Sequence, residues 1–349
     1  AFFAFAVVLG MGYSWQFALT AVFLEGIIFI LLTFMNVREA IIASIPINLK
    51  RAITVGIGLF IAHIGFQGAG MVVDHPATLV TVGDLTSAKA IVAMIGLMVA
   101  GFLLAKNTKG AILIAIIVST IISIPLGVAS IEGFTLVSMP ASLEPIFWQF
   151  EFDKVLSLEM LTVLFTFLFV DMFDTVGTLI GVTTKAGILN KDGTIPRVKQ
   201  ALLADAIGTT FGAICGTSTV TTYVESAAGV EEGGKTGLTA LVAAGMFAIS
   251  LIFAPVFLLI PGAATAPAMI LVGLFMTTPI LEIDFKDFTE AIPAFLCFMM
   301  MPLTYEPSEG IIFGVVSWTI LKAITGKTKE IAPLTWILTV IFIVKVIVH

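Results

Sequence analysis

The sequence predicts an all-α polytopic membrane protein, and three observations lead to that fold class. Hydrophobic residues make up 59% of the 349 residues and charged residues only 11%, and the mean hydropathy is +1.13. Apolar runs recur along the whole chain, each near the roughly 20 residues that a helix needs to cross a bilayer. The alternation typical of membrane β-barrels is missing. A bundle of membrane-spanning helices in a lipid bilayer is therefore expected.

Hydropathy divides the chain into eleven expected spans. The opening run, AFFAFAVVLG, is too short to span and has neither a starting Met nor a signal-peptide pattern, so the chain is expected to be truncated at its N-terminus. Whether residues 333–349 cross is left open, because a full span there would place the C-terminus outside. The expected spans are 16–36, 52–73, 88–105, 111–129, 158–182, 201–215, 238–260, 266–280, 291–303, 310–324 and 334–348.

The basic residues predict the orientation, because cytoplasmic loops retain Lys and Arg. Connections 73–86 and 130–157 carry almost no positive charge and are expected outside. The net charge of −6 comes without a basic patch, which gives nucleic-acid binding no support. Fourteen of the 17 basic residues fall in connections expected to be cytoplasmic: Arg38, Lys50, Arg51, Lys106, Lys109, Lys185, Lys191, Arg197, Lys199, Lys235, Lys286, Lys322, Lys327 and Lys329.

Cysteine and histidine are too few and too scattered for a metal centre. Cys215 and Cys297 both lie in or beside apolar segments, so we expect them to pack as small hydrophobic residues. The three histidines show no zinc-binding spacing. No metal or cofactor is expected, and a membrane enzyme is disfavoured.

The chain contains a weak internal repeat, which is typical of transporters built from two inverted halves. Leu19-Thr20-Ala21 followed by Gly26 recurs as Leu238-Thr239-Ala240 followed by Gly245. Ile45-Pro46 followed by Gly58-Leu59-Phe60 recurs as Ile260-Pro261 followed by Gly273-Leu274-Phe275. The separations, 219 and 215 residues, agree after one four-residue gap. The order and spacing predict an internal duplication.

One polar stretch, GTSTVTTYVES at 216–226, interrupts the apolar sequence. Its β-branched residues favour a short strand, in which Thr217, Thr219, Thr221, Tyr223 and Glu225 face one way. The small residues from Ser226 onward can begin a half-helix. A paired strand from the first repeat would satisfy its backbone within the membrane, and the repeat register places that partner just before residue 1. The alternative is a Ser/Thr-rich helix whose hydroxyls bond back to the backbone.

A second constellation, FVDMFDTVGTLIG, places two acids inside an apolar helix. Asp171 and Asp174 lie three residues apart, and an ionisable residue within a span is a candidate functional group. Gly177 and Thr178 give Asp174 small neighbours that a flat ligand can approach. Asp171 is either a second site residue or a partner of a neighbouring helix.

Other polar residues inside the spans have more ordinary explanations. Asp205 is expected to brace the polar stretch. Glu25, His63 and Gln67 are expected to line a cavity or bond between helices. Glu309 is expected in a helix cap.

At these residues a resemblance becomes specific. FDTVGTLIGVTTKAG, TSTVTTYVESAAGVEEGGKTGLTA and SIPINLKRAITVGIGLF resemble the adenine/guanine/hypoxanthine permeases, the AzgA-like branch of the nucleobase/ascorbate transporter group. The resemblance runs essentially end to end. It implies fourteen segments in two inverted repeats of seven, the first incomplete here, with short membrane-embedded strands at the substrate site. It also implies a core domain (1–37 and 157–261), a gate domain (38–130 and 262–349, with the C-terminal hydrophobic segment) and an external connection at 131–156.

The same resemblance implies proton-coupled import of purine nucleobases across the cytoplasmic membrane. It assigns the proton and the base to Asp174 and Glu225, without deciding which carboxylate carries the proton, and implies a homodimer through the gate domain. Thr178, Thr219, Tyr223 and the backbone at Val224 complete the expected site, supported by Asp171, Asp205 and Gly177. Uracil, xanthine or a small anion remain alternative substrates, and a channel or a membrane enzyme is the alternative of another class.

Overall fold

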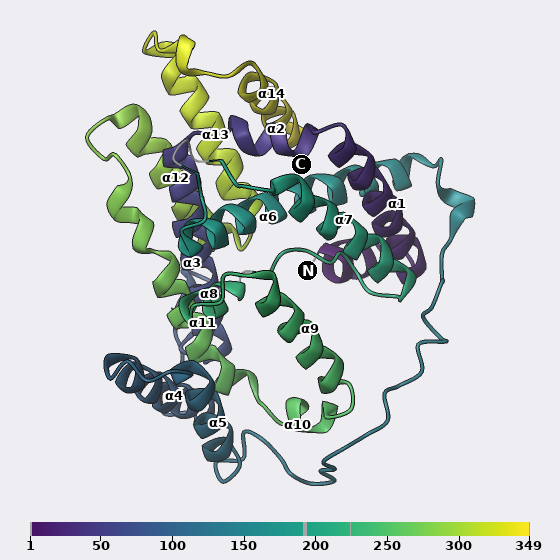
Figure 1. The fold of residues 1–349 in the computed structure, drawn as a ribbon, viewed down its shortest axis with the longest axis vertical. Coiled ribbons are helices and arrows are strands. Elements are labelled where there is room, and N and C mark those ends of the chain that lie inside the picture. The colour runs from purple at the N-terminus through teal and green to yellow at the C-terminus, as the bar shows by residue number, and fades with distance from the viewer. Residues whose placement is uncertain (1, 191–193, 224, 349) are drawn as a thin grey trace. The chain divides into compact units, whose positions relative to one another are not determined.

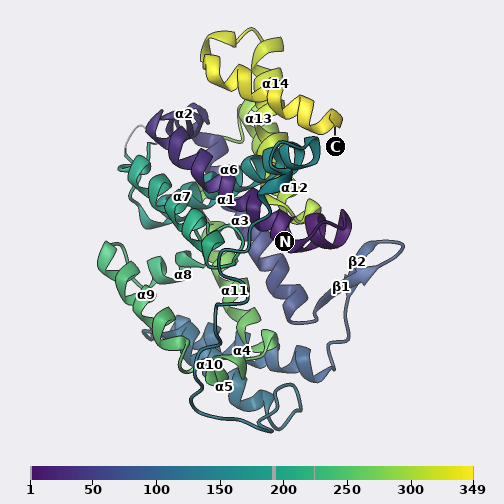
Figure 2. The same cartoon turned by 90° about the vertical axis from the view of Figure 1, so that its right-hand side faces the viewer.

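The computed structural model describes residues 2–190, 194–223 and 225–348, and it is helical throughout most of them (Figures 1 and 2). A π-helical turn, η1 (Phe2–Gly10), precedes the first α-helix. The α-helices are α1 (Trp15–Phe34), α2 (Val37–Ser44), α3 (Ile47–Gly68), α4 (Ala88–Ala105), α5 (Ala111–Ser123), α6 (Leu158–Ala186), α7 (Val198–Ile214), α8 (Ser226–Glu231), α9 (Gly237–Ser250), α10 (Ala254–Leu258), α11 (Gly262–Met276), α12 (Phe288–Thr304), α13 (Pro307–Ile324) and α14 (Pro333–Val348).

Six helical stretches among the described residues are long and apolar enough to cross a membrane. Shorter apolar helices, α5, α9, α12 and most of α14, accompany them. The six stretches are Trp15–Phe34, Ile47–Gly68, Ala88–Ala105, Leu158–Ala186, Gly262–Glu282 and Pro307–Ile324. The helical multi-pass class predicted from composition is therefore confirmed.

Local chemistry explains several helix boundaries. The hydroxyls of Ser14, Ser87 and Ser157 accept hydrogen bonds from the backbone N–H three residues ahead, at 3.1, 3.3 and 3.1 Å, so each serine begins a helix. At the other end of α6, Gly187 adopts a left-handed conformation with φ of 66°, which glycine reaches without steric cost. These caps fix where α1, α4 and α6 lie along the chain.

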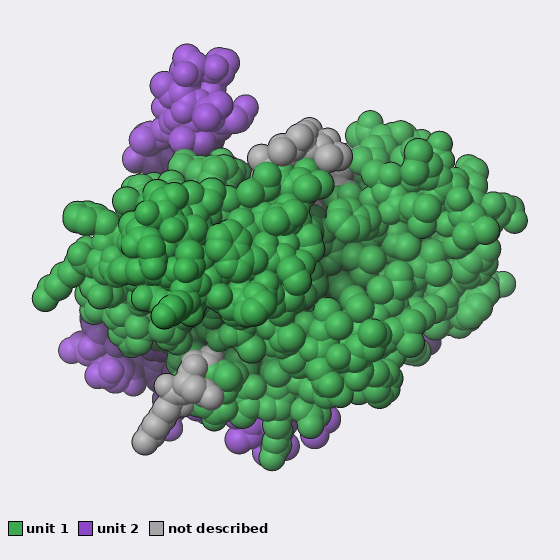
Figure 3. Space-filling model, turned by 90° about the horizontal axis from the view of Figure 1, so that it is seen from above, with its two compact units in different colours: residues 1–54, 142–224, 280–349 green, residues 55–141, 225–279 purple. Residues whose placement is uncertain are grey.

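Contacts divide the chain into two compact units (Figure 3). Unit 1 comprises residues 1–54, 142–224 and 280–349, and unit 2 comprises residues 55–141 and 225–279. The core-and-gate division expected from the sequence has other boundaries and stays a prediction.

In unit 1, α1 packs on α6 and α7, while α12 pairs with α13. The hydrophobic core between α1 and α6 includes Phe17, Val22, Met160 and Phe167. Helix α13 also contacts α6 and α14. This packing places α6, with its two acids, between helices from both ends of the chain.

In unit 2, α4, α5 and α11 pack against one another. They meet at Gly96, where a Cβ would lie 2.3 Å from Ser119 Oγ and 2.9 Å from Pro267 Cγ. A hairpin of β1 (Val72–His75) and β2 (Leu79–Val82), with Val72 opposite Val82, follows α3. The sequence predicted only an external connection at 73–86, so this hairpin was missed.

Two glycines matched by the internal repeat contact each other in unit 2. A Cβ on Gly58 of α3 would lie 2.7 Å from the Gly273 carbonyl oxygen, and one on Gly273 of α11 would lie 2.5 Å from that of Gly58. Each position needs glycine because the other backbone occupies the space of its side chain. Such a reciprocal contact is what two equivalent segments related by an approximate twofold axis would make.

Prolines correct two of the expected spans. The span at 238–260 is broken into α9 and α10, because Pro255 lacks an N–H and its ring would clash with the carbonyl of residue 251 in a continuous helix. Helix α5 ends at Ser123 rather than at 129, because Pro125 has no N–H to donate to the carbonyl of residue 121 in a continuing helix, and its ring would clash with that carbonyl.

The polar stretch differs from the expected strand. Residues 217–223 have no regular secondary structure, and the expected half-helix follows as α8 from Ser226. Gly216, with φ of 89°, turns the chain back along α7. The backbone of Val220 bonds to the side chain of Thr209 instead of a strand: its N–H donates to Thr209 Oγ1 at 3.2 Å, and its carbonyl accepts from Oγ1 at 2.8 Å. With these groups bonded to a hydroxyl, Val220 does not take part in a ladder.

Candidate functional site

The candidate site in unit 1 is built around a buried arginine. Arg38 on α2 is fully buried, and its Nη2 donates to Asp205 Oδ2 of α7 at 3.0 Å. Nη1 donates to the Leu202 carbonyl at 3.2 Å, and the guanidinium lies 4.0 Å from the centre of the Phe29 ring. A buried ion pair of this kind is costly to break, because the charge left behind cannot reach water.

Asp205 joins this arginine to helix α6 and to the polar stretch. Thr175 of α6 donates its hydroxyl to the Asp205 carboxylate at 3.3 to 3.4 Å, and the backbone of Thr222 lies near that carboxylate. Thr175 Oγ1 lies 2.6 Å from Thr221 Oγ1. Asp205 therefore holds residues 221–222 against α6.

The path of the polar stretch is also shaped by small residues on α7. A Cβ on Gly212 would lie 2.7 Å from Val220 Cγ2, and one on Gly208 would lie 3.2 Å from Val220 Cγ1. The valine thus packs into a space that two glycines leave on the helix. Together with the Thr209 hydroxyl, this packing fixes the middle of the stretch.

Two further carboxyl groups lie beside this network. Glu25 of α1 is fully buried and Asp171 of α6 is 5% exposed. No donor among the described residues reaches either oxygen of Glu25 or Oδ2 of Asp171. The two side chains lie close enough to act on each other electrostatically, and two carboxyl groups can form a hydrogen bond only when one of them carries a proton.

The structure places the other predicted residues of α6 along the same helix. Asp174 is half-buried, one turn beyond Asp171, and Gly177 and Thr178 are buried. On the polar stretch, Thr219 is half-buried and the Tyr223 side chain is 59% exposed.

The two remaining predicted residues follow Tyr223. Val224 lies outside the described residues. Glu225 is exposed, immediately precedes α8 and belongs to unit 2. Their expected roles at the substrate stay predictions.

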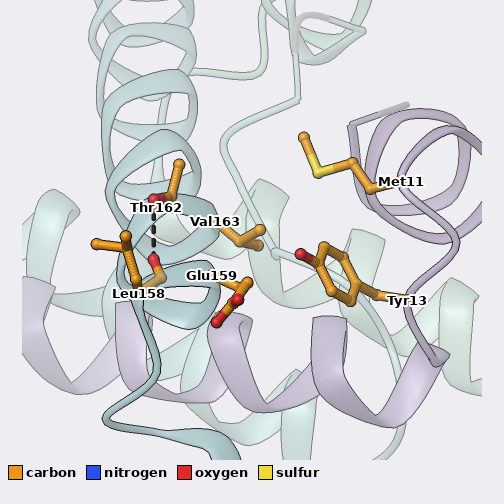
Figure 4. A pocket seen from close by; sticks show the side chains of 6 residues that line it. All are labelled: Met11, Tyr13, Leu158, Glu159, Thr162 and Val163. Atoms are coloured by element: carbon orange, nitrogen blue, oxygen red, sulfur yellow. Dashed lines mark hydrogen bonds between the residues drawn. The ribbon is translucent and has the colours of Figure 1, made fainter.

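A pocket of about 240 Å³ also lies in unit 1, away from these residues (Figure 4). Met11 and Tyr13 line it from the segment before α1, and Tyr13 points its hydroxyl toward α6. The first turns of α6 supply the rest of the lining: Leu158, Glu159, Thr162 and Val163. Thr162 Oγ1 bonds to the Leu158 carbonyl at 2.9 Å and is thereby occupied within the helix. None of the predicted site residues that the structure describes lines this pocket.

Sequence reasoning missed the arginine and two of the threonines. Arg38 was expected in a cytoplasmic connection because charge usually marks a loop, yet it is fully buried. A signal existed: Asp205 in an apolar segment needs a cation, and basic residues inside the spans are few. Thr175 and Thr209 carry no comparable sequence signal, because most threonines in membrane helices bond to their own backbone.

Helices of membrane-crossing length around a buried charged cluster define a multi-pass membrane protein. Comparison with known sequences then places it: the chain matches the Permease family (Xan_ur_permease) over residues 1–337 and belongs to that family. It is therefore a transporter rather than an enzyme.

Relatives and a solved structure agree with this assignment. The chain is 40% identical to the adenine permease AdeP of Escherichia coli, covering 99% of this chain and 78% of that protein. It is 41% identical to the guanine/hypoxanthine permease PbuG of Bacillus subtilis, covering 95% and 75%. The fold is similar to the transmembrane domain of a cyanobacterium bicarbonate transporter, BicA, with a TM-score of 0.56 at 17% identity over 86% of this chain and 76% of that one.

Proposed function

We propose that the chain imports purine nucleobases (hypoxanthine, guanine or adenine) by proton symport across the cytoplasmic membrane. The observation that carries this proposal is the near-complete match to relatives named as adenine and guanine/hypoxanthine permeases, at 40% and 41% identity. Buried acids inside apolar helices support it, because such residues commonly mark substrate and proton paths.

The chemistry of a purine fits the predicted residues. The base is flat and neutral and presents N–H donors along its edges, so carboxylate acceptors and backbone groups suit it. In this proposal Asp174 and Glu225 accept from the base, and the backbone near Val224 binds beside them. A base without the matching donor leaves a buried acceptor unpaired, at a cost of about 1–3 kcal/mol.

The smaller predicted residues shape the space around the base. Thr178 lies one turn beyond Asp174 on α6, and Gly177 leaves room for a flat ring. Thr219 and Tyr223 belong to the polar stretch, which the Asp205 network holds against α6.

Transport requires the bound base to reach first one side of the membrane and then the other. In this proposal the core segments, 1–37 and 157–261, move against the gate segments, 38–130 and 262–349, and the gate also forms a homodimer. A proton taken up outside neutralises a site carboxylate, and the proton and the base are both released inside when the core segments move against the gate segments.

Uptake of radiolabelled hypoxanthine, guanine and adenine into cells that lack purine transport tests the proposal, with and without a protonophore. Saturable uptake that the protonophore abolishes is the expected result. No uptake of any purine by a correctly inserted protein would overturn the purine assignment, and uptake insensitive to the protonophore would overturn the symport.

Charge-removing variants test the predicted binding residues. Asp174→Asn and Glu225→Gln are expected to abolish purine binding, and hence uptake, without loss of membrane insertion. Asp153→Asn, at an exposed carboxylate in the 3-10 turn Phe152–Lys154, is the matched control and should transport normally. Asp171→Asn should retain binding, so equal loss of binding in all three acid variants would point to a folding role.

A further inference from the structure

The starting observation is a mismatch between acceptors and donors in unit 1. Glu25 and Asp171 are buried and come from two different helices, α1 and α6, that pack together. If both were ionised, they would be acceptors only, and none of the described donors reaches Glu25 Oε1, Glu25 Oε2 or Asp171 Oδ2. Two adjacent buried carboxylates without donors repel each other and pay the full cost of lost hydration.

The nearby cation does not resolve this mismatch. Arg38 is the positive charge that acts on both carboxyl groups, but its Nη2 is bonded to Asp205 at 3.0 Å and its Nη1 to the Leu202 carbonyl. Its attraction is thus largely balanced by the nearest of the three acids. Glu25 and Asp171 then carry an uncompensated charge that a single proton would halve.

Apart from Arg38, the charged groups that act on Glu25 and Asp171 are themselves acids. Asp174 faces Asp171 from the next turn of α6 and adds further negative charge. On the helices packed against the other side of α6, Lys345 of α14 pairs with Glu309 of α13. A proton is therefore the simplest way to neutralise the pair.

We propose that Glu25 and Asp171 share one proton and are the pair that takes up and releases the proton coupled to transport. The proposal rests on the proposed proton symport and names its carrier, which the sequence expected at Asp174 or Glu225. In the proton-loaded form one carboxyl donates its O–H to the other. On release the O–H bond breaks, the proton passes to water, and two carboxylates remain; no other covalent bond changes.

A chain of contacts connects this pair to the proposed substrate segment. Asp171 precedes Thr175 by one helical turn, and Thr175 bonds both to Asp205 and to Thr221. When the pair loses its proton, its added negative charge competes with Asp205 for Arg38. Weakening the bond between Arg38 and Asp205 loosens the group that holds residues 221–222, so proton release and base release are linked.

Two assays on vesicles containing the purified protein distinguish proton coupling from purine transport. One assay measures purine accumulation driven by an imposed pH gradient, and the other measures exchange of labelled for unlabelled purine at equal concentration and equal pH. Glu25→Gln is expected to retain exchange, to make its rate independent of pH, and to lose accumulation to the level of vesicles without a gradient. A purely structural role for Glu25 would reduce both activities together.

Glu39→Gln is the matched control. Glu39 of α2 is also a carboxyl whose oxygens find no donor among the described residues, but it is not among the charges that act on the pair. It should keep both accumulation and exchange. Accumulation that survives in Glu25→Gln would overturn the inference while leaving proton symport intact, whereas a wild-type protein that does not accumulate purine would overturn the symport itself.

Infrared difference spectroscopy tests the shared proton without any transport. A protonated carboxyl has a carbonyl stretch that a carboxylate lacks, so the wild-type protein should show this band at neutral pH. The double variant Glu25→Gln/Asp171→Asn should lose it, while Glu39→Gln keeps it. Identical spectra for the wild type and the double variant would overturn the shared proton. This comparison does not depend on whether the single variants fold.

Discussion

Unit 1 contains two buried charged clusters that are satisfied in different ways. In the cluster between α12 and α13, Glu290 accepts hydrogen bonds from Asn48 at 3.0 Å, Trp318 at 3.1 Å and Lys322 at 2.8 Å. In the cluster between α1 and α6, no donor of a described residue reaches either oxygen of Glu25 or Oδ2 of Asp171. One cluster has donors for its acid, and the other lacks them.

This difference separates a structural role from a functional one. A fully bonded carboxylate is stabilised in its ionised state, because every hydrogen bond to it favours that state. An incompletely bonded pair of carboxyl groups is not held in the ionised state by donors, so it can gain and lose a proton as its surroundings change. We therefore assign the functional role to Glu25 and Asp171 rather than to the more numerous ion pairs.

We expect the largest effect from removing Arg38, which pairs with Asp205 and acts on Glu25 and Asp171. Arg38→Ala leaves Asp205 buried without its cation, and we expect the free energy of unfolding to fall by about 3–5 kcal/mol. Denaturant titration in detergent measures the change. Adding Asp205→Asn should recover part of the loss, and a double variant as unstable as the single one would show that the ion pair is not the cause.

The fully bonded cluster should respond to charge removal by losing stability alone. Glu290→Gln weakens the bond from Lys322 and leaves its ammonium partly unpaired, so we expect a loss of about 1–3 kcal/mol in the free energy of unfolding. Purine accumulation per folded molecule should not change. Loss of pH-driven accumulation with normal exchange in this variant would contradict the division between the two clusters.

The same type of substitution in the second cluster should change the free energy of unfolding in the opposite direction. Glu25→Gln supplies an N–H donor to Asp171 at every pH, whereas the wild-type pair has a donor only while it holds the shared proton. We therefore expect the free energy of unfolding to rise by up to about 1 kcal/mol at a pH high enough to remove that proton. The same denaturant titration compares it with Glu290→Gln. A loss of stability as large as that of Glu290→Gln would indicate that Glu25 is a structural residue with a donor of its own.

The smallest expected effect lies outside the spans, at Asp287 before α12. Its carboxylate bonds to Lys327 Nζ at 2.7 Å and to Thr289, and the Lys327 bond is the main cause that lowers its pKa below the ordinary value of 3.8. Because the folded-state pKa is the lower one, the stabilisation is complete above about pH 4 and is lost as the pH falls toward the folded-state value.

Comparing the wild type with Asp287→Asn across that range checks the sign. The wild type should be slightly more stable at neutral pH, and the difference should shrink as the solution becomes acidic. A difference that grows on acidification would show that this aspartate is destabilising in its ionised form.

Local sequence signals predicted the helices better than the contacts between them. The expected span 88–105 coincides with α4, because Ser87 caps one end and a polar connection follows the other. Pro125 and Pro255 also carried a local signal, and giving them more weight would have corrected the ends of two spans.

The partners of the site residues could not be read in the same way. Arg38 and Asp205 are 167 residues apart, and no local pattern pairs one with the other. The polar stretch was identified from its composition, but its bonding to Thr209 depends on how the chain turns at Gly216. The residue types of the site were thus accessible from the sequence, while the arrangement that leaves Glu25 and Oδ2 of Asp171 without a donor among the described residues was not.

The most direct test of proton-coupled purine transport is the pH inside vesicles when purine is added outside, with no gradient imposed. A pH-sensitive dye trapped in the vesicles should report acidification that saturates with purine concentration in the wild type and is absent in Glu25→Gln. Purine entry into wild-type vesicles without any change of internal pH would contradict the account.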